Sequence, residues 1–88
     1  MKKQSVTVRC ENGLHMRVAA GVVNLVSKHA AAVHLACGDC KKANACSILE
    51  LITLGVEKGA KIEITAEGRD EEIVTEQLSQ MFEQGDGI

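Results

Sequence analysis

The hydrophobic pattern of this chain switches repeatedly between a period of two residues and a helical period, and each switch marks a new element. Alternating stretches predict strands over residues 5–10, 32–37 and 60–67, and a shorter strand over 41–43. Gly38 and Asp39 have the composition of a two-residue hairpin turn between the second and third strands. The residues expected to face inward from the strands are Val6, Val8, Cys10, Val33, Leu35, Cys37, Ile62, Ile64 and Ala66.

Helical spacing of apolar residues predicts three helices. The first begins at Met16, ends near Lys28 and carries the apolar residues Val18, Ala19, Val22, Val23, Leu25 and Val26. The second covers 47–54 and is closed by Gly55. The third covers 69–82 with an apolar stripe of Ile73, Val74, Leu78, Met81 and Phe82, and residues 83–88 are expected to be a frayed tail.

The predicted order of elements is βαββαβα. Each strand is apolar on one side and polar on the other, which is typical of an antiparallel sheet with one covered face. The expected fold is therefore α+β, an open-faced sandwich in which three helices cover one face of a four-stranded antiparallel sheet. The length of the chain predicts a single domain over residues 1–88 with a small core, and hence a shallow site or a docking surface.

Composition excludes some classes of function. Ten Lys and Arg residues stand against twelve Asp and Glu, and Phe82 is the one aromatic residue, so no nucleic-acid partner is expected. The N-terminal MKKQSVTV has no apolar stretch behind its lysines, and the run VAAGVVNLV is too short to span a bilayer. The expected location is the cytoplasm, without membrane insertion, where Cys10, Cys37, Cys40 and Cys46 would be reduced thiols.

His15 lies between a turn sequence, Glu11-Asn12-Gly13, and the start of the first helix. The first N–H groups of a helix have no intrahelical partner and attract anions. An imidazole titrates near neutral pH and can act as a nucleophile, while the planar guanidinium of nearby Arg17 suits a phosphate. These residue types allow a histidine that carries a phosphoryl group. They also allow an ordinary, partly exposed surface histidine.

Two stretches resemble the HPr family of histidine phosphocarriers. GLHMRVAA resembles the family's active-site motif G-[LI]-H-A-R-P-A, and NACSILELITLGVEKGAKIEITAEG is similar to the family's N-x-K-S-I-M pattern and the segment that follows it. The resemblance covers essentially the whole chain and implies the same βαββαβα fold. It implies that His15 takes a phosphoryl group on Nδ1 from enzyme I of the bacterial sugar phosphotransferase system and passes it to IIA components of sugar permeases. Arg17 would stabilise the phosphate, and neither a cofactor nor a metal is implied.

The first motif departs from the family at two positions. Met16 stands in place of Ala and adds a flexible apolar side chain beside His15. Val18 stands in place of Pro. The loss of Pro would lower the preorganisation of the first helical turn by up to about 1 kcal/mol. Neither change removes a chemical group used in phosphoryl transfer, so the resemblance implies the transfer but not its rate.

Ser47 has two interpretations. Ser47-Ile48-Leu49-Glu50 is a capping box, in which the serine stabilises the second helix by about 1 kcal/mol. By resemblance Ser47 also matches a serine that a kinase/phosphorylase modifies in many low-GC Gram-positive bacteria. Cys46 and Glu50 stand where the family often has Lys and Gly, so the surroundings are less cationic than is usual. Helix capping is the favoured role, and regulatory phosphorylation is the alternative.

The second helix has too many apolar residues to bury them all on one side. An exposed apolar cluster on a chain of this size is typical of a partner surface. By resemblance, the positions that would dock enzyme I and IIA are Met16, Ala20, Asn24, Ile48, Leu49, Ile52 and Gly55. For any single one of them, a role in extending the core is an equally good interpretation.

Cys37-Gly38-Asp39-Cys40 is a C-x-x-C motif, which occurs in zinc sites and redox pairs. Cys10 and Cys46 lack the paired spacing of a second zinc half-site, and a redox pair usually opens a helix rather than flanking a hairpin turn. The favoured interpretation is that the two cysteines lie beside a turn and have no joint function. The minor interpretation is a thiol or zinc protein on this fold.

Three hypotheses of function follow from the sequence, the third being the thiol or zinc protein considered above. The first is a phosphoryl carrier that presents one face to successive partners, most simply as a monomer. The second is an HPr-like regulatory or interaction module that acts through Ser47 and the same docking surface, with a kinase/phosphorylase as a further partner and no role in sugar transport. The presence of His15 favours the first, whereas Met16 and Val18 mildly favour the second.

Overall fold

The computed structural model describes residues 1–9, 14, 16–37 and 41–84. Within these ranges it has four strands, β1 (Lys2–Thr7), β2 (Ala32–Cys37), β3 (Lys41–Asn44) and β4 (Lys61–Glu67). It also has three helices there, α1 (Met16–Ser27), α2 (Ile48–Thr53) and α3 (Glu71–Gln84). The predicted βαββαβα order is confirmed.

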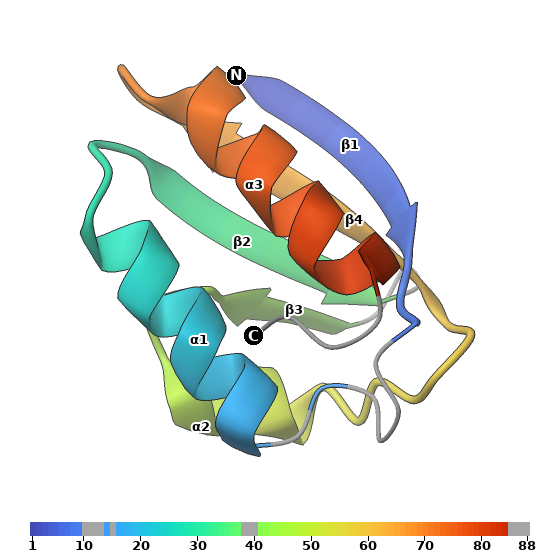
Figure 1. Ribbon diagram of the computed structural model, residues 1–88. Helices are drawn as coiled ribbons and strands as arrows, with labels where there is room; N and C mark the ends of the chain where they lie inside the picture. The colour runs from blue at the N-terminus through green and yellow to red at the C-terminus, as the bar shows by residue number, and fades with distance from the viewer. Residues whose placement is uncertain (10–13, 15, 38–40, 85–88) are drawn as a thin grey trace.

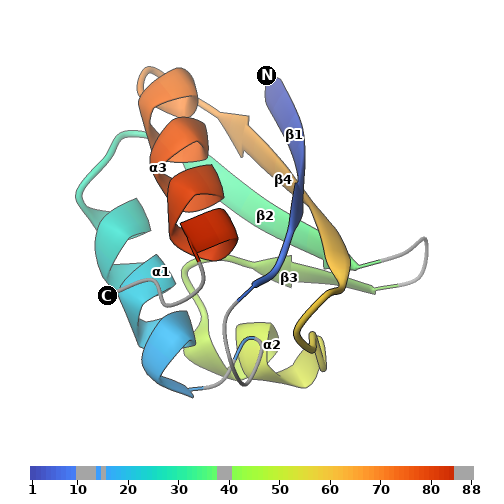
Figure 2. The same ribbon diagram turned by 45° about the vertical axis from the view of Figure 1, so that its right-hand side comes forward.

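The strands form one antiparallel sheet in the order β1-β4-β2-β3. The helices cover one face of this sheet, with α3 over its β1–β4 side and α1 and α2 toward β2 and β3 (Figures 1 and 2). The other face lies open, and the predicted α+β open-faced sandwich is therefore confirmed. None of the helices in the described part of the chain has the length and apolar character needed to cross a membrane.

The core lies between the sheet and the helices. Its largest fully buried side chains are those of Phe82, Leu35, Leu51, Ile62, Ile64 and Leu78. The two-residue alternation correctly placed Val33, Leu35, Ile62, Ile64 and Ala66 inward. On α1 the helical spacing correctly placed Val18, Ala19, Val22 and Val26, whereas Val23 and Leu25 are half-buried against the core. The hydrophobic period thus carries most of the information on which side chains fill the core.

The predicted bounds of β1 are wrong at both ends. The strand begins at Lys2 rather than Ser5, because Lys2–Thr7 pairs with β4 along its whole length. It ends at Thr7 because the backbone of Val8 bonds to the turn before β4: its N–H donates to the Ala60 carbonyl at 2.8 Å, and its carbonyl accepts from Gly59 N–H at 2.7 Å. Val8 is nevertheless fully buried, as predicted, and Cys10 lies outside the described residues.

The hairpin between β2 and β3 also differs from the prediction. The register pairs Cys37 with Lys41, so three residues separate the paired positions instead of the two expected. Gly38 and Asp39 themselves lie outside the described residues. β3 extends one residue beyond the predicted 41–43, because Asn44 still pairs with His34.

The apolar stripe of α3 is rotated relative to the prediction. Ile73 is 52% exposed, whereas Thr75 is buried beside Val74 and Leu78. Residues 74, 78 and 82 recur at a spacing of four and face the sheet, which turns Ile73 toward the side of the helix. The helix itself covers 71–84 instead of 69–82, so Glu83 and Gln84 belong to it rather than to a frayed tail. Residues 85–88 lie outside the described part.

The connection into α3 is fastened to the connection between α1 and β2. Asp70 N–H donates to the Ala30 carbonyl at 3.1 Å, and the Asp70 carboxylate accepts from Ala30 N–H at 2.8 Å. Gly68, with a φ of +147°, lies so close to this loop that a Cβ atom there would be 2.5 Å from the Ala30 oxygen. These contacts fix the position of α3 relative to α1.

Glu71, the first residue of α3, ties the helix to two other groups. Its carboxylate accepts from Gly68 N–H at 3.1 Å and lies 3.2 Å from the N-terminal ammonium of Met1. The Gly68 hydrogen bond, followed by the ammonium, lowers the pKa of Glu71 below its usual value of 4.5. The ionised form is therefore favoured in the folded state.

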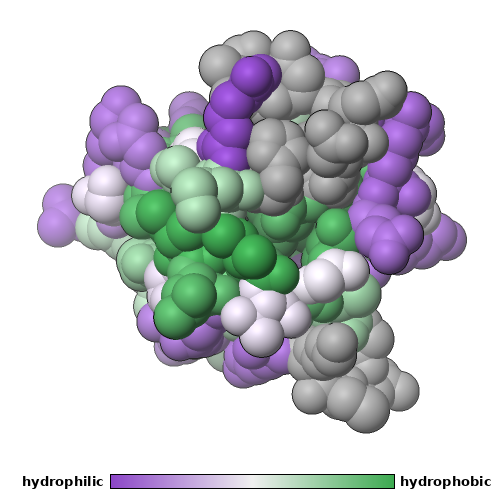
Figure 3. All heavy atoms as spheres, turned by 90° about the horizontal axis from the view of Figure 1, so that it is seen from below, coloured by the Kyte–Doolittle hydropathy of each residue, from purple (hydrophilic) through white to green (hydrophobic). Residues whose placement is uncertain are grey.

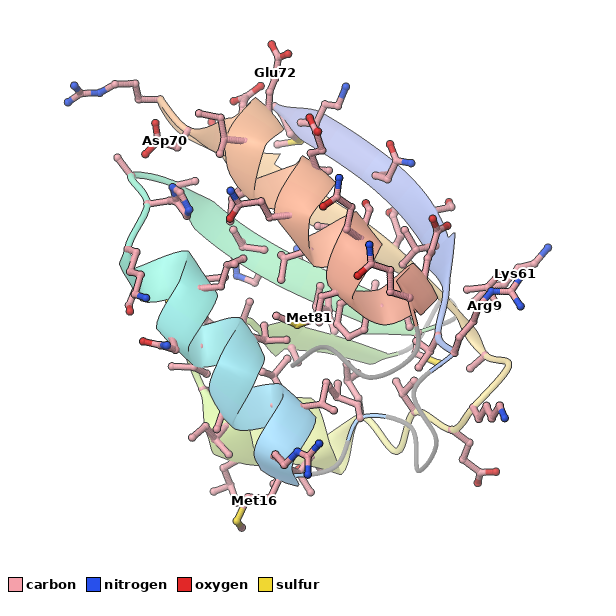
Figure 4. The ribbon with its side chains drawn as sticks, viewed as in Figure 1. Arg9, Met16, Lys61, Asp70, Glu72 and Met81 are labelled. Atoms are coloured by element: carbon pink, nitrogen blue, oxygen red, sulfur yellow. The ribbon has the colours of Figure 1, made fainter. Side chains whose placement is uncertain are left out.

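A lowered carboxyl pKa predicts a contribution to stability that is present above pH 4.5 and is lost as the pH falls through the folded pKa. Glu71→Gln should consequently lower the stability at pH 7 and should reduce the loss on acidification, as measured by urea unfolding at pH 7 and pH 3. The exposed neighbour Glu72, which points away from the body of the protein (Figure 4), provides the control Glu72→Gln. Equal pH dependence in the two variants would contradict this role of Glu71.

Candidate functional site

Leu14, the residue before His15, holds the start of α1 against the core. Leu14 is buried, and its N–H donates to the Val56 carbonyl at 3.1 Å. Two residues later, Met16 begins α1 with a side chain that is 67% exposed and points away from the body of the protein (Figure 4). His15 lies outside the described residues. Its two neighbours in the chain therefore mark the transition from the core to an exposed helix start.

The first turn of α1 favours an anion. It contains no acidic residue, so no side chain of this turn opposes the positive end of the helix dipole. Arg17, the second residue of α1, is exposed and adds a guanidinium to the same turn. Val18, which stands where the HPr motif has Pro, is 2% exposed and packs in the core. Val18 thus anchors the first turn by packing.

Apolar side chains of α1 and α2 gather on one face of the protein. Figure 3 shows this concentration where α2 and the first turns of α1 lie. We call it the apolar face, made up of Met16, Ala20, Ile48, Leu49 and Ile52. Leu49 is 77% exposed and Met16 67%, while Ile48 and Ile52 are half-buried against the core. Leu51, by contrast, is fully buried, so α2 divides its apolar residues between core and surface.

The other two predicted docking residues lie at the ends of this region. Asn24 is exposed on α1, one turn beyond Ala20. Gly55 follows α2 with a φ of +69°, and its N–H donates to the Ile52 carbonyl at 3.1 Å. The cap itself is Leu54, and Gly55 is the left-handed residue after it, which is where glycine is favoured.

Ser47 is the N-cap of α2, as predicted. Its Oγ accepts from Glu50 N–H at 3.3 Å, and its backbone is extended. The second half of the predicted capping box is wrong: Glu50 Oε1 accepts from Asn44 N–H at 2.9 Å rather than from Ser47 N–H, which donates to the Asn44 carbonyl at 3.0 Å. Glu50 therefore connects α2 to the end of β3. The capping-box pattern of residues 47–50 could not predict this hydrogen bond, because Asn44 lies outside that pattern.

The cysteines are spread over the fold. Cys37 is half-buried at the end of β2, Cys46 is exposed before α2, and both are free thiols. Cys10 and Cys40 lie outside the described residues, so the C-x-x-C motif is described only at its first position. In the ranges that are described, no three His, Cys, Asp or Glu side chains are grouped closely enough to hold a metal ion.

A groove between α1 and α3 was not predicted from the sequence. Its volume is about 650 Å³, and its lining residues are Ala20, Gly21, Asn24, Leu25, Lys28, His29, Gln77 and Met81. Figure 4 shows Met81 pointing from α3 toward α1. The two walls come from helices that are separated in the chain by three strands and a helix, so no local spacing could have indicated it. Ala20 and Asn24 belong both to the groove and to the predicted docking residues.

Comparison with known proteins agrees with the fold and the motifs. A family model described as the PTS HPr component phosphorylation site matches residues 2–84. The phosphocarrier protein HPr of Borreliella burgdorferi is 32% identical over 83 residues, covering 94% of this chain and 95% of that protein. The HPr-like protein Crh of Bacillus subtilis is 38% identical over 79 residues, covering 90% and 92%. The crystal structure of HPr-C-His from Thermoanaerobacter tengcongensis superposes with a TM-score of 0.86 at 35% identity, covering 93% of this chain and 91% of that one. The chain belongs to the HPr family.

Proposed function

We propose that this protein is a phosphoryl carrier of the sugar phosphotransferase system. His15 accepts a phosphoryl group on Nδ1 from phosphorylated enzyme I and passes it to IIA components of sugar permeases. In each step one phosphorus–nitrogen bond to the donor breaks while a bond to the acceptor forms. The observation that carries the proposal is the family match over residues 2–84, which includes the GLHMR motif. The last two residues of this motif begin α1, whose first turn has no acidic side chain.

The roles of the site residues follow from their chemistry. His15 is the nucleophile and carries the phosphoryl group between partners. Arg17 and the first N–H groups of α1 stabilise the phosphate oxygens, since a guanidinium and a helix N-terminus both favour an anion. This chemistry needs neither a cofactor nor a metal.

The apolar face is the proposed contact for enzyme I and IIA, together with Asn24 and Gly55. Exposed, contiguous apolar side chains are typical of a surface that a partner covers. A carrier that offers the same face to its donor and its acceptor in turn is most simply a monomer, which we include in the proposal.

Leu49 gives the sharpest test of this face, because its side chain is 77% exposed. Leu49→Asp places a charge where an apolar contact is proposed, and it should lower kcat/KM for phosphorylation by enzyme I about tenfold or more. The free energy of unfolding measured in urea should change by less than about 0.5 kcal/mol, as expected for an exposed position. Gln4→Asp, which adds the same charge at an exposed position of the edge strand β1, away from α1 and α2, is the control. An unchanged kcat/KM in Leu49→Asp would remove Leu49 from the interface.

A regulatory or interaction module is the second candidate function. It is favoured by the likeness to Crh of Bacillus subtilis, which is described as HPr-like. Such a module would use the same apolar face and phosphorylation of Ser47 by a kinase/phosphorylase, without carrying phosphate to a sugar. The engagement of Ser47 Oγ as the cap of α2 supports a structural role for this serine in either case.

The proposed function is tested by following phosphate to an acceptor. Enzyme I in catalytic amount, phosphoenolpyruvate and a IIA protein are incubated with and without this chain, and the phosphorylation of IIA is measured. We expect IIA to become phosphorylated only when the chain is present. A folded chain that leaves IIA unphosphorylated would favour the regulatory module.

A further inference from the structure

The connection between α2 and β4 holds one end of the segment that joins β1 to α1. Val8, the first residue of that segment, donates its N–H to the Ala60 carbonyl at 2.8 Å, and its carbonyl accepts from Gly59 N–H at 2.7 Å. The connection is closed by a turn, in which Ala60 N–H donates to the Glu57 carbonyl at 3.0 Å. This turn therefore fixes where the chain leaves β1 on its way to α1.

Val56, which lies in the same connection, holds the other end of that segment. Its carbonyl accepts from Leu14 N–H at 3.1 Å. Val56 and Leu14 are both buried and both belong to the core. Because an unpaired backbone group in a buried residue is costly, the hydrogen bond and the packing of Val56 are maintained together. The position of Val56 thus sets the position of Leu14, the residue before His15.

Phosphoryl transfer depends on this placement. The residue before His15 is held by Val56, and the residue after it begins α1, whose first turn is anchored by the buried Val18. The attacking nitrogen has to approach the phosphorus in line with the leaving group. A displacement of about 1 Å can cost about a hundredfold in rate. The rate therefore depends on how well the backbone on either side of His15 is held.

We propose that Val56 is a positioning residue for phosphoryl transfer to His15. It places Leu14, and through Leu14 the backbone from which the His15 side chain extends. Because Val56 is buried, it touches neither the phosphate nor the partner, and it acts on kcat rather than on KM. This inference rests on the proposed function, since it concerns the rate at which the same nucleophile reacts.

Val56→Ala tests this role by deleting two methyl groups from the core beside the carbonyl that holds Leu14. The kcat for phosphorylation by enzyme I should fall at least about fivefold, whereas KM should change by less than about twofold. Val74→Ala is the matched control, because it makes the same deletion at a fully buried valine near the start of α3, at the opposite end of the molecule from α2 (Figures 1 and 2). At this distance from the site, kcat should stay within about twofold of wild type.

Two NMR measurements report on position rather than on stability. In wild type, the Leu14 amide should exchange with solvent at least about tenfold more slowly than in an unstructured chain, because it is bonded to Val56. The ring signals of His15 should shift in Val56→Ala and stay in place in Val74→Ala. Exchange of the wild-type Leu14 amide at the unstructured rate would overturn the inference, even if Val56→Ala failed to fold.

The outcomes separate this inference from the proposed function. If wild type is phosphorylated on His15 and the two Val→Ala variants have the same kcat, Val56 contributes to stability alone, and the inference is overturned while the proposed function stands. A raised KM at unchanged kcat in Val56→Ala would assign it to docking and would overturn the inference as well. If enzyme I does not phosphorylate wild type, both are overturned.

Discussion

Gly68→Ala is expected to lower the free energy of unfolding by about 2–5 kcal/mol, the sum of a steric and a backbone cost. The steric cost arises because the new Cβ would lie 2.5 Å from the Ala30 oxygen and 2.7 Å from the Ala31 Cα, both of which are backbone atoms. The backbone cost arises from the φ of +147° at Gly68, which residues with a Cβ rarely adopt. To relieve the clash, the loop at Ala30 would have to move away from Asp70 and α3.

Gly59→Ala separates the two costs. Gly59 has a φ of +93°, but a Cβ there would have no atom within 4 Å, so only the backbone cost of about 1–2 kcal/mol applies. Urea unfolding of both variants measures the difference. Equal losses in the two variants would show that the close approach of Gly68 to Ala30 contributes nothing to stability.

His15→Ala is expected to abolish the formation of acid-labile phosphate by enzyme I and phosphoenolpyruvate. The reason is chemical: the variant lacks the proposed nucleophile, and neither Arg17 nor a backbone N–H can replace it as an acceptor. The loss should be complete, in contrast to the partial loss expected from Leu49→Asp. Intact mass spectrometry after incubation measures the phosphorylated fraction.

His34→Ala is the matched control for His15→Ala. His34 lies on β2, between Val33 and Leu35, which point into the core, so its half-buried side chain is on the open face of the sheet. This face is opposite the helices, and His34→Ala should leave the phosphorylated fraction unchanged. Loss of phosphorylation in His34→Ala but not in His15→Ala would place the phosphate on the wrong face for the proposed site.

The strands with an alternating pattern were predicted well because burial and sequence carry the same period there. In β4, Ile62, Ile64 and Ala66 point inward, and the charged residues Lys61, Glu63 and Glu67 are exposed. The first half of β1 carries no such signal, since residues 2–5 are all exposed on an edge strand. Its position is set by backbone pairing with β4, which is distant in the chain.

The helices show a similar division between local and tertiary information. The cap at Ser47 and the left-handed Gly55 depend on a few neighbouring residues, and both could be predicted. The bond from Asn44 N–H to the Glu50 carboxylate depends on where β3 ends relative to α2. The exposure of Ile73 and the burial of Thr75 depend on the rotation of α3 against the sheet.

The candidate site divides in the same way. The His15 motif and the apolar residues of α2 are short local patterns, so the sequence pointed to a phosphoryl carrier with a docking face. The groove is formed by α1 and α3, whose facing residues Leu25 and Met81 are far apart in the chain. A pattern within either helix alone could not show that their side chains border the same space.

The proposed role as a histidine phosphocarrier is tested most directly by the chemical nature of any phosphate that enzyme I adds to the chain. The wild-type protein is incubated with enzyme I and phosphoenolpyruvate, and its intact mass is measured before and after brief acid treatment. A single added phosphate that acid removes is the predicted result, because a phosphorus–nitrogen bond to His15 is labile in acid. An unmodified mass would contradict the proposal that this protein is a histidine phosphocarrier. A phosphate that survives the acid treatment would contradict it too, because a serine ester, for example at Ser47, is stable in acid.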